Sequence, residues 1–295
     1  MDRDDFIFEL NAIKDDINLK RTLELFDIPR SSFYERVNRE ESHRERENRR
    51  ILEKIERIWE SSGRVYGAPK IHALLVTHEN EDCSLKRVQK LMHKQGIRSI
   101  TQKKWRPHRS ADPVPDDRVN LLNQDFSTTG LNQVWVTDIT YIWTGKDEWS
   151  YLSTIIDLYS RKAIWSFSRQ MTVDLVLDTL TKATQRYGAA EGLILHSDLG
   201  SQYTSEAYES ALEKQGIRHS FSRKGSPHDN AVIESFHSIV KKEEVYQKNY
   251  PDFDTAYREL FQYIEAFYNR KRIHSALGNR TPLAIEQAYL DQAVI

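Results

Sequence analysis

Hydrophobic positions change their spacing along the chain, and the change divides it into two kinds of sequence. Before residue 107 the apolar residues recur every three or four positions, which is typical of helices. From residue 134 onward, short runs rich in β-branched and aromatic residues alternate with helical stretches. The pattern predicts a helical N-terminal part followed by an α/β sheet with helices on its faces.

The first helical part, residues 17 to 38, predicts two short helices around a turn. The apolar spacing is broken at Asp27 and Pro29 and then resumes. The second helix opens with Arg30, Ser31 and Ser32, and either serine is a suitable N-cap. Such a pair is a helix-turn-helix candidate for DNA binding, although an ordinary helical hairpin would show the same pattern.

Three further helical stretches are predicted before residue 110. The first, at residues 38 to 60, carries charges of both signs and is interpreted as a connecting or packing helix. A turn at residues 66 to 70 precedes a second helix from Ile71 to Thr77. The third helix runs from residue 84 to residue 95 and ends at Gly96, a suitable C-cap.

This third stretch begins a block of positive charge. Its basic residues are expected to point outward, because its apolar positions are expected to face inward. These apolar positions are Leu85, Val88, Leu91 and Met92. From residue 84 to residue 109 there are nine Lys and Arg and no Asp or Glu: Lys86, Arg87, Lys90, Lys94, Arg98, Lys103, Lys104, Arg106 and Arg109. Such clustering favours contact with DNA phosphates over a merely solvated basic face.

A linker and a sheet are predicted in the second half. Residues 111 to 130 are interpreted as a linker because they contain Pro113, Pro115 and Gly130. Three strands with short connections, at 134–143, 149–157 and 163–168, predict an antiparallel meander. The remaining elements are a helix at 172–187, a strand at 192–196, a helix at 205–215, a strand at 217–221 and a helix after Asn230.

Composition narrows the class of protein. The chain of 295 residues has a formal net charge of -1, so only the local basic block points to a polyanionic partner. Cys83 is the only cysteine, which excludes an intramolecular disulfide and argues against a cysteine-based zinc site. No apolar run approaches the ~18 residues of a membrane span, and the acidic start is unlike a signal peptide. We therefore expect a protein of the reduced cytoplasm.

Three carboxylates stand where chemistry is expected. Asp138 lies inside an apolar strand, where burying a carboxylate is costly, and Asp198 follows directly after another strand. Glu234 lies in the first turns of a helix, with Lys241 seven residues later on the same face. Three acids in one site repel one another unless a cation lies between them. Oxygen ligands of this kind suit Mg²⁺ or Mn²⁺, and two such ions can promote phosphodiester chemistry.

The residues around these acids resemble the DDE integrase core. The three blocks, in order, are Trp135-x-x-Asp138-Ile139-Thr140-Tyr141, His196-Ser197-Asp198-x-Gly200-Ser201-Gln202-Tyr203 and Gly225-x-Pro227-x-Asp229-Asn230-Ala231-x-x-Glu234-Ser235. More narrowly, the chain resembles the second-reading-frame product of insertion-sequence transposases that are made from two overlapping frames. Three other regions resemble the same group: the helix-turn-helix near Arg30-Ser31-Ser32, the region from Tyr66-Gly67 to Gly96, and the tail Tyr268-Asn269-x-x-Arg272-Ile273-His274-x-x-Leu277-x-x-x-Thr281-Pro282.

This resemblance implies a fold, an activity and a set of roles. The fold is an α/β ribonuclease H-like catalytic core, a mixed sheet flanked by helices, preceded by all-α helix-turn-helix DNA-binding domains. The activity is metal-dependent cleavage of transposon-end DNA and transfer of the 3′-hydroxyl to a new phosphodiester. Asp138, Asp198 and Glu234 would bind two Mg²⁺ ions, for which Mn²⁺ can substitute. Further DNA contacts would come from Lys241, Asn230, His228, Arg30, Ser31, Ser32, Lys86, Arg87, Lys90, Lys103 and Lys104.

The resemblance also implies partners and a domain plan. The partner is double-stranded DNA, both terminal inverted repeats and target, bound by a homodimer or a larger assembly. An upstream-frame fusion partner is left open. The expected domains are a helix-turn-helix (1–40), a connecting helix and basic module (41–110), a linker (111–130), a ribonuclease H-like integrase core (131–248) and a helical tail of that core (249–295).

Other interpretations compete with this one. Any single acid is more readily explained as a structural residue, and Asp157 is interpreted as a strand-end hydrogen-bonding group. His196 is interpreted as packing or support beside Asp198, and Trp135 as core. The histidines lack the zinc-binding spacing of the N-terminal module of retroviral integrases. At the level of function, the alternatives are a catalytically inactive DNA-binding regulator, a decayed transposase, and a nuclease that only hydrolyses DNA.

Overall fold

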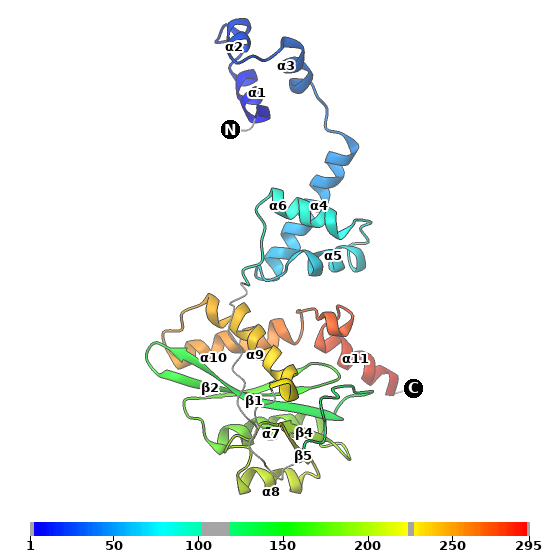
Figure 1. Ribbon diagram of the computed structural model, residues 1–295, viewed down its shortest axis with the longest axis vertical. Coiled ribbons are helices and arrows are strands. Elements are labelled where there is room, and N and C mark those ends of the chain that lie inside the picture. Colours follow the sequence, from blue (N-terminus) through cyan, green and yellow to red (C-terminus); the bar gives the residue numbers. More distant parts are fainter. Residues whose placement is uncertain (1–2, 102–118, 224–226, 294–295) are drawn as a thin grey trace. The chain divides into compact units, whose positions relative to one another are not determined.

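The computed structural model describes residues 3–101, 119–223 and 227–293, without the side chains of residues 3–5, 227, 228 and 293 (Figure 1). It divides into two compact units, Met1–Glu56 and Arg57–Ile295. The boundary between the units falls inside helix α4 (His43–Ser61). The candidate chemistry lies in the second unit.

The first unit is a small bundle of short helices. Its elements are α1 (Arg3–Ala12), α2 (Leu19–Leu25), α3 (Arg30–Val37) and the start of α4. The helix pair predicted at 17–38 is confirmed, whereas α1 had no counterpart in the prediction. The N-cap prediction was wrong, because α3 begins at Arg30 and its N-cap is Pro29, whose φ of -59° already suits the helix. Ser31 and Ser32 therefore lie inside its first turn.

In the second unit, the end of α4 is followed by two helices, α5 (Ala68–Thr77) and α6 (Leu85–Lys94). Ser84 caps α6 by accepting a hydrogen bond from the backbone N–H of Arg87. Gly96 has a φ of +67°, a left-handed conformation that suits glycine after a helix. Val88 and Met92 are buried as predicted, but Leu85 is exposed, so its expected inward direction was wrong. Leu85 is the first residue of the helix and lies beyond the buried stripe.

The sheet that follows has five strands in the order β3-β2-β1-β4-β5. Their bounds are β1 (Val134–Thr144), β2 (Glu148–Asp157), β3 (Ala163–Ser168), β4 (Ile194–Ser197) and β5 (Arg218–Phe221). β1 pairs with β2, and β2 with β3, in antiparallel fashion, so the predicted meander is confirmed. β4 pairs in parallel with both β1 and β5. The sheet is therefore mixed.

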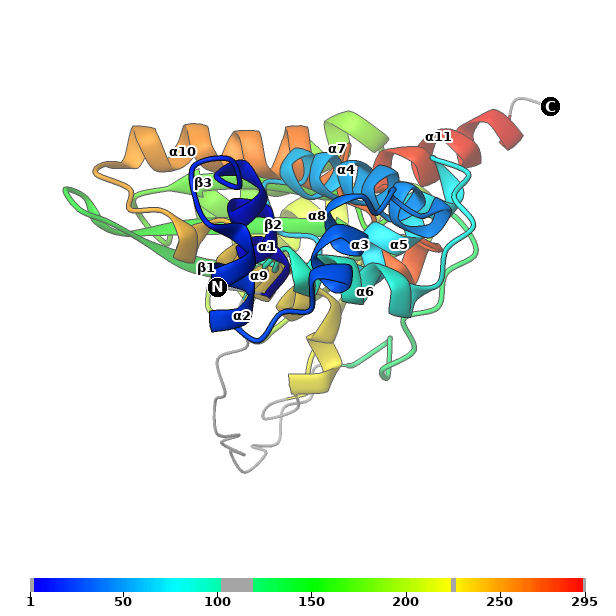
Figure 2. The same cartoon turned by 90° about the horizontal axis from the view of Figure 1, so that it is seen from above.

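Helices cover both faces of the sheet (Figure 1). One face packs against α7 (Val173–Tyr187) and α8 (Glu206–Lys214) through a core that contains Trp135, Val176 and Leu212. The other face packs against α9 (Ala231–Glu243) and α10 (Phe253–Phe261) through Val136, Phe236 and Leu260. Figure 2 looks onto this second face. Successive residues of β1 alternate between the two cores, as strand geometry requires.

The tail continues the α9 face. After α10 come a π-helical segment, η3 (Gln262–Tyr268), a short 3₁₀ turn, η4 (Ser275–Leu277), and the last helix, α11 (Pro282–Ala293). The carboxamide of Asn269 bonds both the N–H and the carbonyl of Ala163, at 3.0 and 2.9 Å. This pair of hydrogen bonds fastens the tail to the outer strand β3.

Residues 119–130, the part of the predicted linker that the structure describes, lie against the sheet. The N–H of Leu121 donates to the Ser220 hydroxyl at 2.9 Å, and the side chain of Leu122 is buried in the α9-side core. The N–H of Phe221 in β5 donates to the carbonyl of Val119. These contacts place the segment beside the turn that precedes α9.

Candidate active site

The two aspartates are brought together by strand pairing. The parallel pairing of β1 and β4 ends with Val136 opposite His196. Asp138 and Asp198 each follow two residues later, so the register brings the two aspartates near each other. Asp138 has the same parity as Val136 and therefore points to the α9 face. Burial raises the pKa of Asp198, and the nearby Asp138 carboxylate raises it further. The two acids repel each other, as ligands that share a cation do in its absence.

Each aspartate has a local backbone contact that fixes its direction. The Asp138 carboxylate accepts a hydrogen bond from the N–H of Ile139 at 2.8 Å. The Asp198 carboxylate accepts one from the N–H of Gly200 at 2.9 Å. A Cβ on Gly200 would lie only 2.9 Å from that same Asp198 oxygen, so the close approach depends on glycine at this position.

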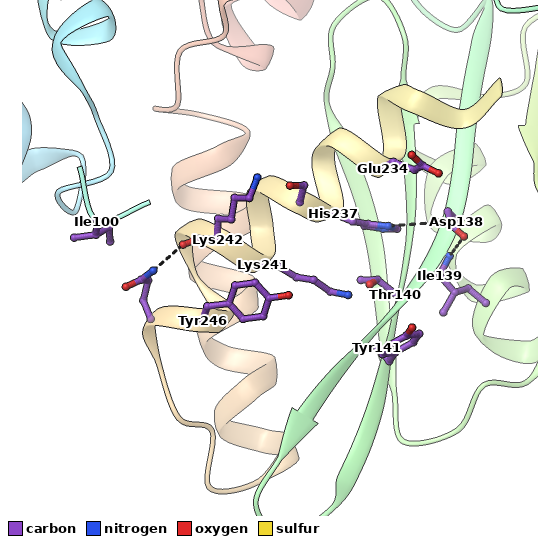
Figure 3. A pocket seen from close by; sticks show the side chains of 12 residues that line it. Ile100, Asp138, Ile139, Thr140, Tyr141, Glu234, His237, Lys241, Lys242 and Tyr246 are labelled. Carbon is purple, nitrogen blue, oxygen red and sulfur yellow. Dashed lines mark hydrogen bonds and ion pairs between the residues drawn. The ribbon is translucent and has the colours of Figure 1, made fainter. Parts of the chain in front are cut away.

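Glu234 reaches the same region from helix α9. It lies in the first turn of α9, is exposed to solvent, and lines a cavity of about 890 Å³ together with Asp138. Figure 3 shows Glu234, His237 and Lys241 following one another along α9 on the side that faces β1. Lys241 lies 4.8 Å from the ring centroid of Tyr141 and lines the same cavity. The predicted common face of Glu234 and Lys241 is confirmed.

His237 was missed by the sequence analysis. Its side chain is buried, and its Nδ1 lies 3.4 Å from the Asp138 carboxylate (Figure 3). The buried Nε2 has no hydrogen-bond partner among the described residues. His237 follows Glu234 by one helical turn, which is the only sequence signal that could have drawn attention to it.

The turn before α9 is held by a buried carboxylate, Asp229. It accepts five hydrogen bonds, from Asn120, from Gln124 and from the backbone N–H, Nε and Nη2 of Arg223, at 2.7 to 3.0 Å. Burial raises the pKa of Asp229, but the hydrogen bonds from Arg223 and Gln124 outweigh it and hold the pKa well below its usual value. Asp229 with these three residues is called the Asp229 anchor below.

Asn230 and His228 occupy the short helix η1 (Pro227–Asn230) that leads into α9. Asn230 is buried, and its Nδ2 donates to the carbonyl of Thr137 at 3.3 Å, one residue before Asp138. This contact ties the start of α9 to the strand that carries the first acid. The side chain of His228 lies outside the described residues. Contact of either residue with DNA stays a prediction.

The residues with supporting roles agree with their interpretation. Asp157 is buried and accepts hydrogen bonds from Asn132 and Ser160, so it caps a turn rather than serving the site. His196 is buried between the hydroxyls of Ser220 and Ser222, at 2.8 and 2.9 Å. Burial lowers the pKa of His196 to about 4, so the ring is neutral near pH 7.

The remaining DNA-contact predictions fall in separate places. Lys86 and Lys90 are exposed on α6, and Arg87 beside them is half-buried. In the first unit, Arg30 and Ser31 are exposed and Ser32 is half-buried. Lys103 and Lys104 lie outside the described residues. None of these positions is tested by the structure.

The acid triad (Asp138, Asp198 and Glu234) has the donors that a hard divalent cation requires. All three side chains offer carboxylate oxygens, and the repulsion between the two aspartates is what a cation would relieve. Within residues 3–101, 119–223 and 227–293, no three Asp, Glu, His or Cys side chains lie close enough together to enclose a metal.

Comparison with known proteins identifies the family. Residues 129–227 and 215–282 match two families described as "Integrase core domain", and residues 45–105 match an "HTH-like domain". The transposase for insertion sequence element IS904 of Lactococcus lactis subsp. lactis (strain IL1403) is 38% identical over 252 residues, covering 85% of this chain and 99% of the relative. The chain belongs to the insertion-sequence transposases.

Other relatives agree with this assignment. The transposase InsF for insertion sequence IS3A of Escherichia coli (strain K12) is 37% identical over 227 residues, or 76% of this chain and 78% of the relative. The chain is thus a DDE-type DNA strand transferase, whose family carries out DNA transposition and integration with a metal-dependent core. Its mixed sheet flanked by helices is the ribonuclease H-like fold of an integrase core. The HTH-like match at 45–105 falls on the predicted second module rather than on residues 17–38.

Solved structures give a more distant likeness. The simian T-cell lymphotropic virus intasome in complex with PP2A regulatory subunit B56 gamma has a TM-score of 0.45 at 16% identity, covering 72% of this chain and 73% of that one. The HTLV-2 integrase catalytic core domain in complex with magnesium has a TM-score of 0.41 at 16% identity, covering 53% and 97%. No described helix is long and apolar enough to cross a membrane.

Proposed function

We propose that Asp138, Asp198 and Glu234 bind two Mg²⁺ ions and cut one DNA strand at each end of the element. Mn²⁺ can replace Mg²⁺ at such a site, since both prefer oxygen ligands. The metals would supply an activated water and stabilise the leaving oxygen. The observation that carries the proposal is the parallel register of β1 and β4, which sets Asp138 beside Asp198 under the helix that bears Glu234.

The chain's own residues would prepare the site. His237 beside Asp138 holds that carboxylate toward α9, and Asn230 fixes the start of the same helix against Thr137. Lys241, on the Glu234 side of α9, would contact a DNA phosphate next to the scissile bond. The released 3′-hydroxyl then attacks a phosphodiester of the target, with no covalent bond between protein and DNA.

Binding of the terminal repeats would use the helical modules. The start of α3 suits contact with the major groove through Arg30, Ser31 and Ser32. Helix α6 carries a basic stripe formed by Lys86, Arg87 and Lys90. Lys103, Lys104 and His228 are proposed to extend these contacts. Joining two ends requires at least two copies of the transposase on inverted repeats and target DNA. We place this action in the bacterial cytoplasm, at the nucleoid, and leave open an upstream-frame fusion partner.

The test is Asp198→Asn, which keeps the shape of the side chain and removes its charge. Strand transfer with Mg²⁺ should fall on the order of 10³-fold, because a group that stabilises transition-state charge is lost. Binding of terminal-repeat duplex should stay largely intact. Measured joining products and gel-shift affinity separate the two effects. Joining at the wild-type rate would refute the site assignment, and intact binding without any joining in wild type would favour the DNA-binding regulator.

A further inference from the structure

The segment that begins at Tyr66 and the tail segment from Tyr268 to Pro282 have no role in the proposed catalysis. They meet on the side of α9 that faces away from Asp138. The Tyr66 hydroxyl accepts a hydrogen bond from the N–H of Ile273 at 3.1 Å and donates one to the carbonyl of Lys271 at 3.2 Å. The segment that follows Tyr66 is thereby joined to the tail segment around Arg272. Lys70, one helical turn beyond Tyr66, comes close enough to Arg272 for their charges to interact.

A cavity of about 340 Å³ opens at this meeting point. Lys70, Arg161, Arg272 and His274 line it, together with α9 residues such as Ser235 that face away from the acid triad. The cavity is called the Arg161 pocket below. No Asp or Glu is among its lining residues within the described chain. Three cations and the N-terminal half of α9 therefore border one hollow without an acid in its wall.

One of these three cations, Arg272, is neutralised by a carboxylate of the same chain. Arg272 makes a bidentate ion pair with Glu243, at 2.8 Å from Nε and 2.7 Å from Nη2. Arg161 and Lys70 have no carboxylate within ion-pair distance among the described residues; the ammonium of Lys70 lies 4.9 Å from the Tyr66 ring centroid. The carboxylate of Asp157 acts on Arg161, and that of Glu243 on Lys70, only at longer range.

The histidine in the pocket adds an unused donor. Nδ1 of His274 lies 3.5 Å from Nη1 of Arg272, and a guanidinium only donates, so Nδ1 accepts and Nε2 carries the proton of the neutral ring. His274 is 9% exposed, and its Nε2 has no hydrogen-bond partner among the described residues. A buried N–H without an acceptor destabilises the folded chain. An acceptor placed in the pocket would remove that cost.

The charges in the pocket also disfavour one another. Burial lowers the pKa of Lys70 to about 8, and Arg272 pushes in the same direction. Burial lowers the pKa of His274 to about 3, with Arg272 and Lys70 contributing. Such crowding of positive groups is relieved by a bound anion. A purely structural cluster would be expected to pair its cations with acids of the same chain.

We propose that the Arg161 pocket binds a phosphate group of the DNA backbone. Arg161 and Lys70 would supply the charge, and the Nε2–H of His274 would donate to a phosphate oxygen. Since the pocket and the acid triad lie on opposite sides of α9, the DNA held here is a segment other than the one at the scissile phosphate. The inference rests on the proposed action on DNA and adds to it a second point of attachment.

The test compares Arg161→Gln, Lys70→Gln and the double variant with Lys214→Gln, which removes an exposed charge from α8 on the other face of the sheet. Affinity of the full chain for a duplex of its own terminal repeat is measured without divalent metal over a range of salt concentrations. Each single variant should lower the slope of log K against log salt by about 0.9, and the double variant by about twice that. Lys214→Gln should keep the wild-type slope. Thermal unfolding verifies that each variant is folded.

The outcomes are distinct. A double variant that is folded and binds the duplex with the wild-type slope overturns the pocket proposal alone. A wild type that binds no duplex overturns both this inference and the proposed function. Inorganic phosphate should raise the unfolding temperature of the wild type and not of the double variant. Phosphate protection with an unchanged salt slope would mean a site for free anions and would also overturn the assignment to DNA.

Discussion

Asp229 and Glu234 lie five residues apart, yet their surroundings are opposite. Asp229 is fully buried and receives five hydrogen bonds within the Asp229 anchor. Glu234 is exposed beside a large cavity, and the two aspartates that share its site repel each other. The carboxylate whose lone pairs are filled by the protein has a structural role. In the acid triad, by contrast, Glu234 and Asp138 line a cavity, and the Asp138 carboxylate raises the pKa of Asp198.

The largest effect that would sharpen this contrast is on stability. Asp229→Ala should lower the free energy of unfolding by about 1–3 kcal/mol, because a buried acceptor of five hydrogen bonds is lost, although its donor Arg223 can turn to solvent. Asp138→Asn is the matched control, and it should leave the free energy of unfolding unchanged or slightly higher because a like charge is removed. Urea unfolding measures both. Equal stabilities of the two variants would break the distinction between the Asp229 anchor and the acid triad.

Lowering the pH should destabilise the folded chain through the Asp229 anchor. The pKa of Asp229 is lower in the folded chain than its unfolded value of about 3.9, so its stabilising effect is complete above that pH. The effect is lost as pH falls from about 4 toward the folded pKa. Wild type should therefore lose more unfolding free energy between neutral pH and this range than Asp229→Asn does. Parallel pH profiles of the two proteins would contradict the contribution assigned to Asp229.

Mg²⁺ should stabilise the folded chain only through the acid triad. Mg²⁺ at 100 times its dissociation constant should stabilise the wild type by about 2.7 kcal/mol, seen as a higher unfolding temperature. Asp138→Asn should lose most of this response. A potassium salt of equal ionic strength controls for screening. The same rise in both proteins would place the ion elsewhere.

The smallest predicted effect concerns His237. His237→Leu should slow strand transfer about tenfold without weakening DNA binding, since a side chain that orients a metal ligand is lost. His237→Gln keeps an N–H donor and should restore much of the rate. Rates of joining at saturating Mg²⁺ measure both variants. A leucine variant as fast as wild type would show that the contact with Asp138 has no part in the reaction.

Much of the core could be predicted from the sequence because its elements have strong local signals. The three strands of the meander are long runs of β-branched and aromatic residues, and α7 ends at Gly188 with a φ of +69°. Asp138 and Asp198 could be located because Asp138 lies within a strand and Asp198 directly follows one. Helix α1 could not be found in this way, because Ile7 and Leu10 are buried in a cluster with residues that come later in the chain, such as Leu23 of α2 and Phe33 of α3.

The partners of the site are set by tertiary contacts that no spacing reveals. Ninety-nine residues separate Asp138 from His237, and more than a hundred separate Asn120 and Gln124 from Asp229. The segment 119–130 has the composition of a linker, yet its side chains complete the Asp229 anchor. Composition reports only the local conformational preference of a segment. The conformation of this segment depends instead on its hydrogen bonds to the buried carboxylate of Asp229.

The hydroxyl of Tyr66 has a consequence for how the protein is made. Its hydrogen-bond partner at Lys271 is 205 residues later in the chain, so the contact cannot form until the tail has been synthesised. At about 5–20 residues per second, a ribosome needs roughly 10 to 40 s to cover that interval. During that time β1 with its first acid is synthesised first, α9 follows, and the tail comes last. The contact between Tyr66 and the tail therefore forms only after Asp138, Asp198 and Glu234 have all been synthesised.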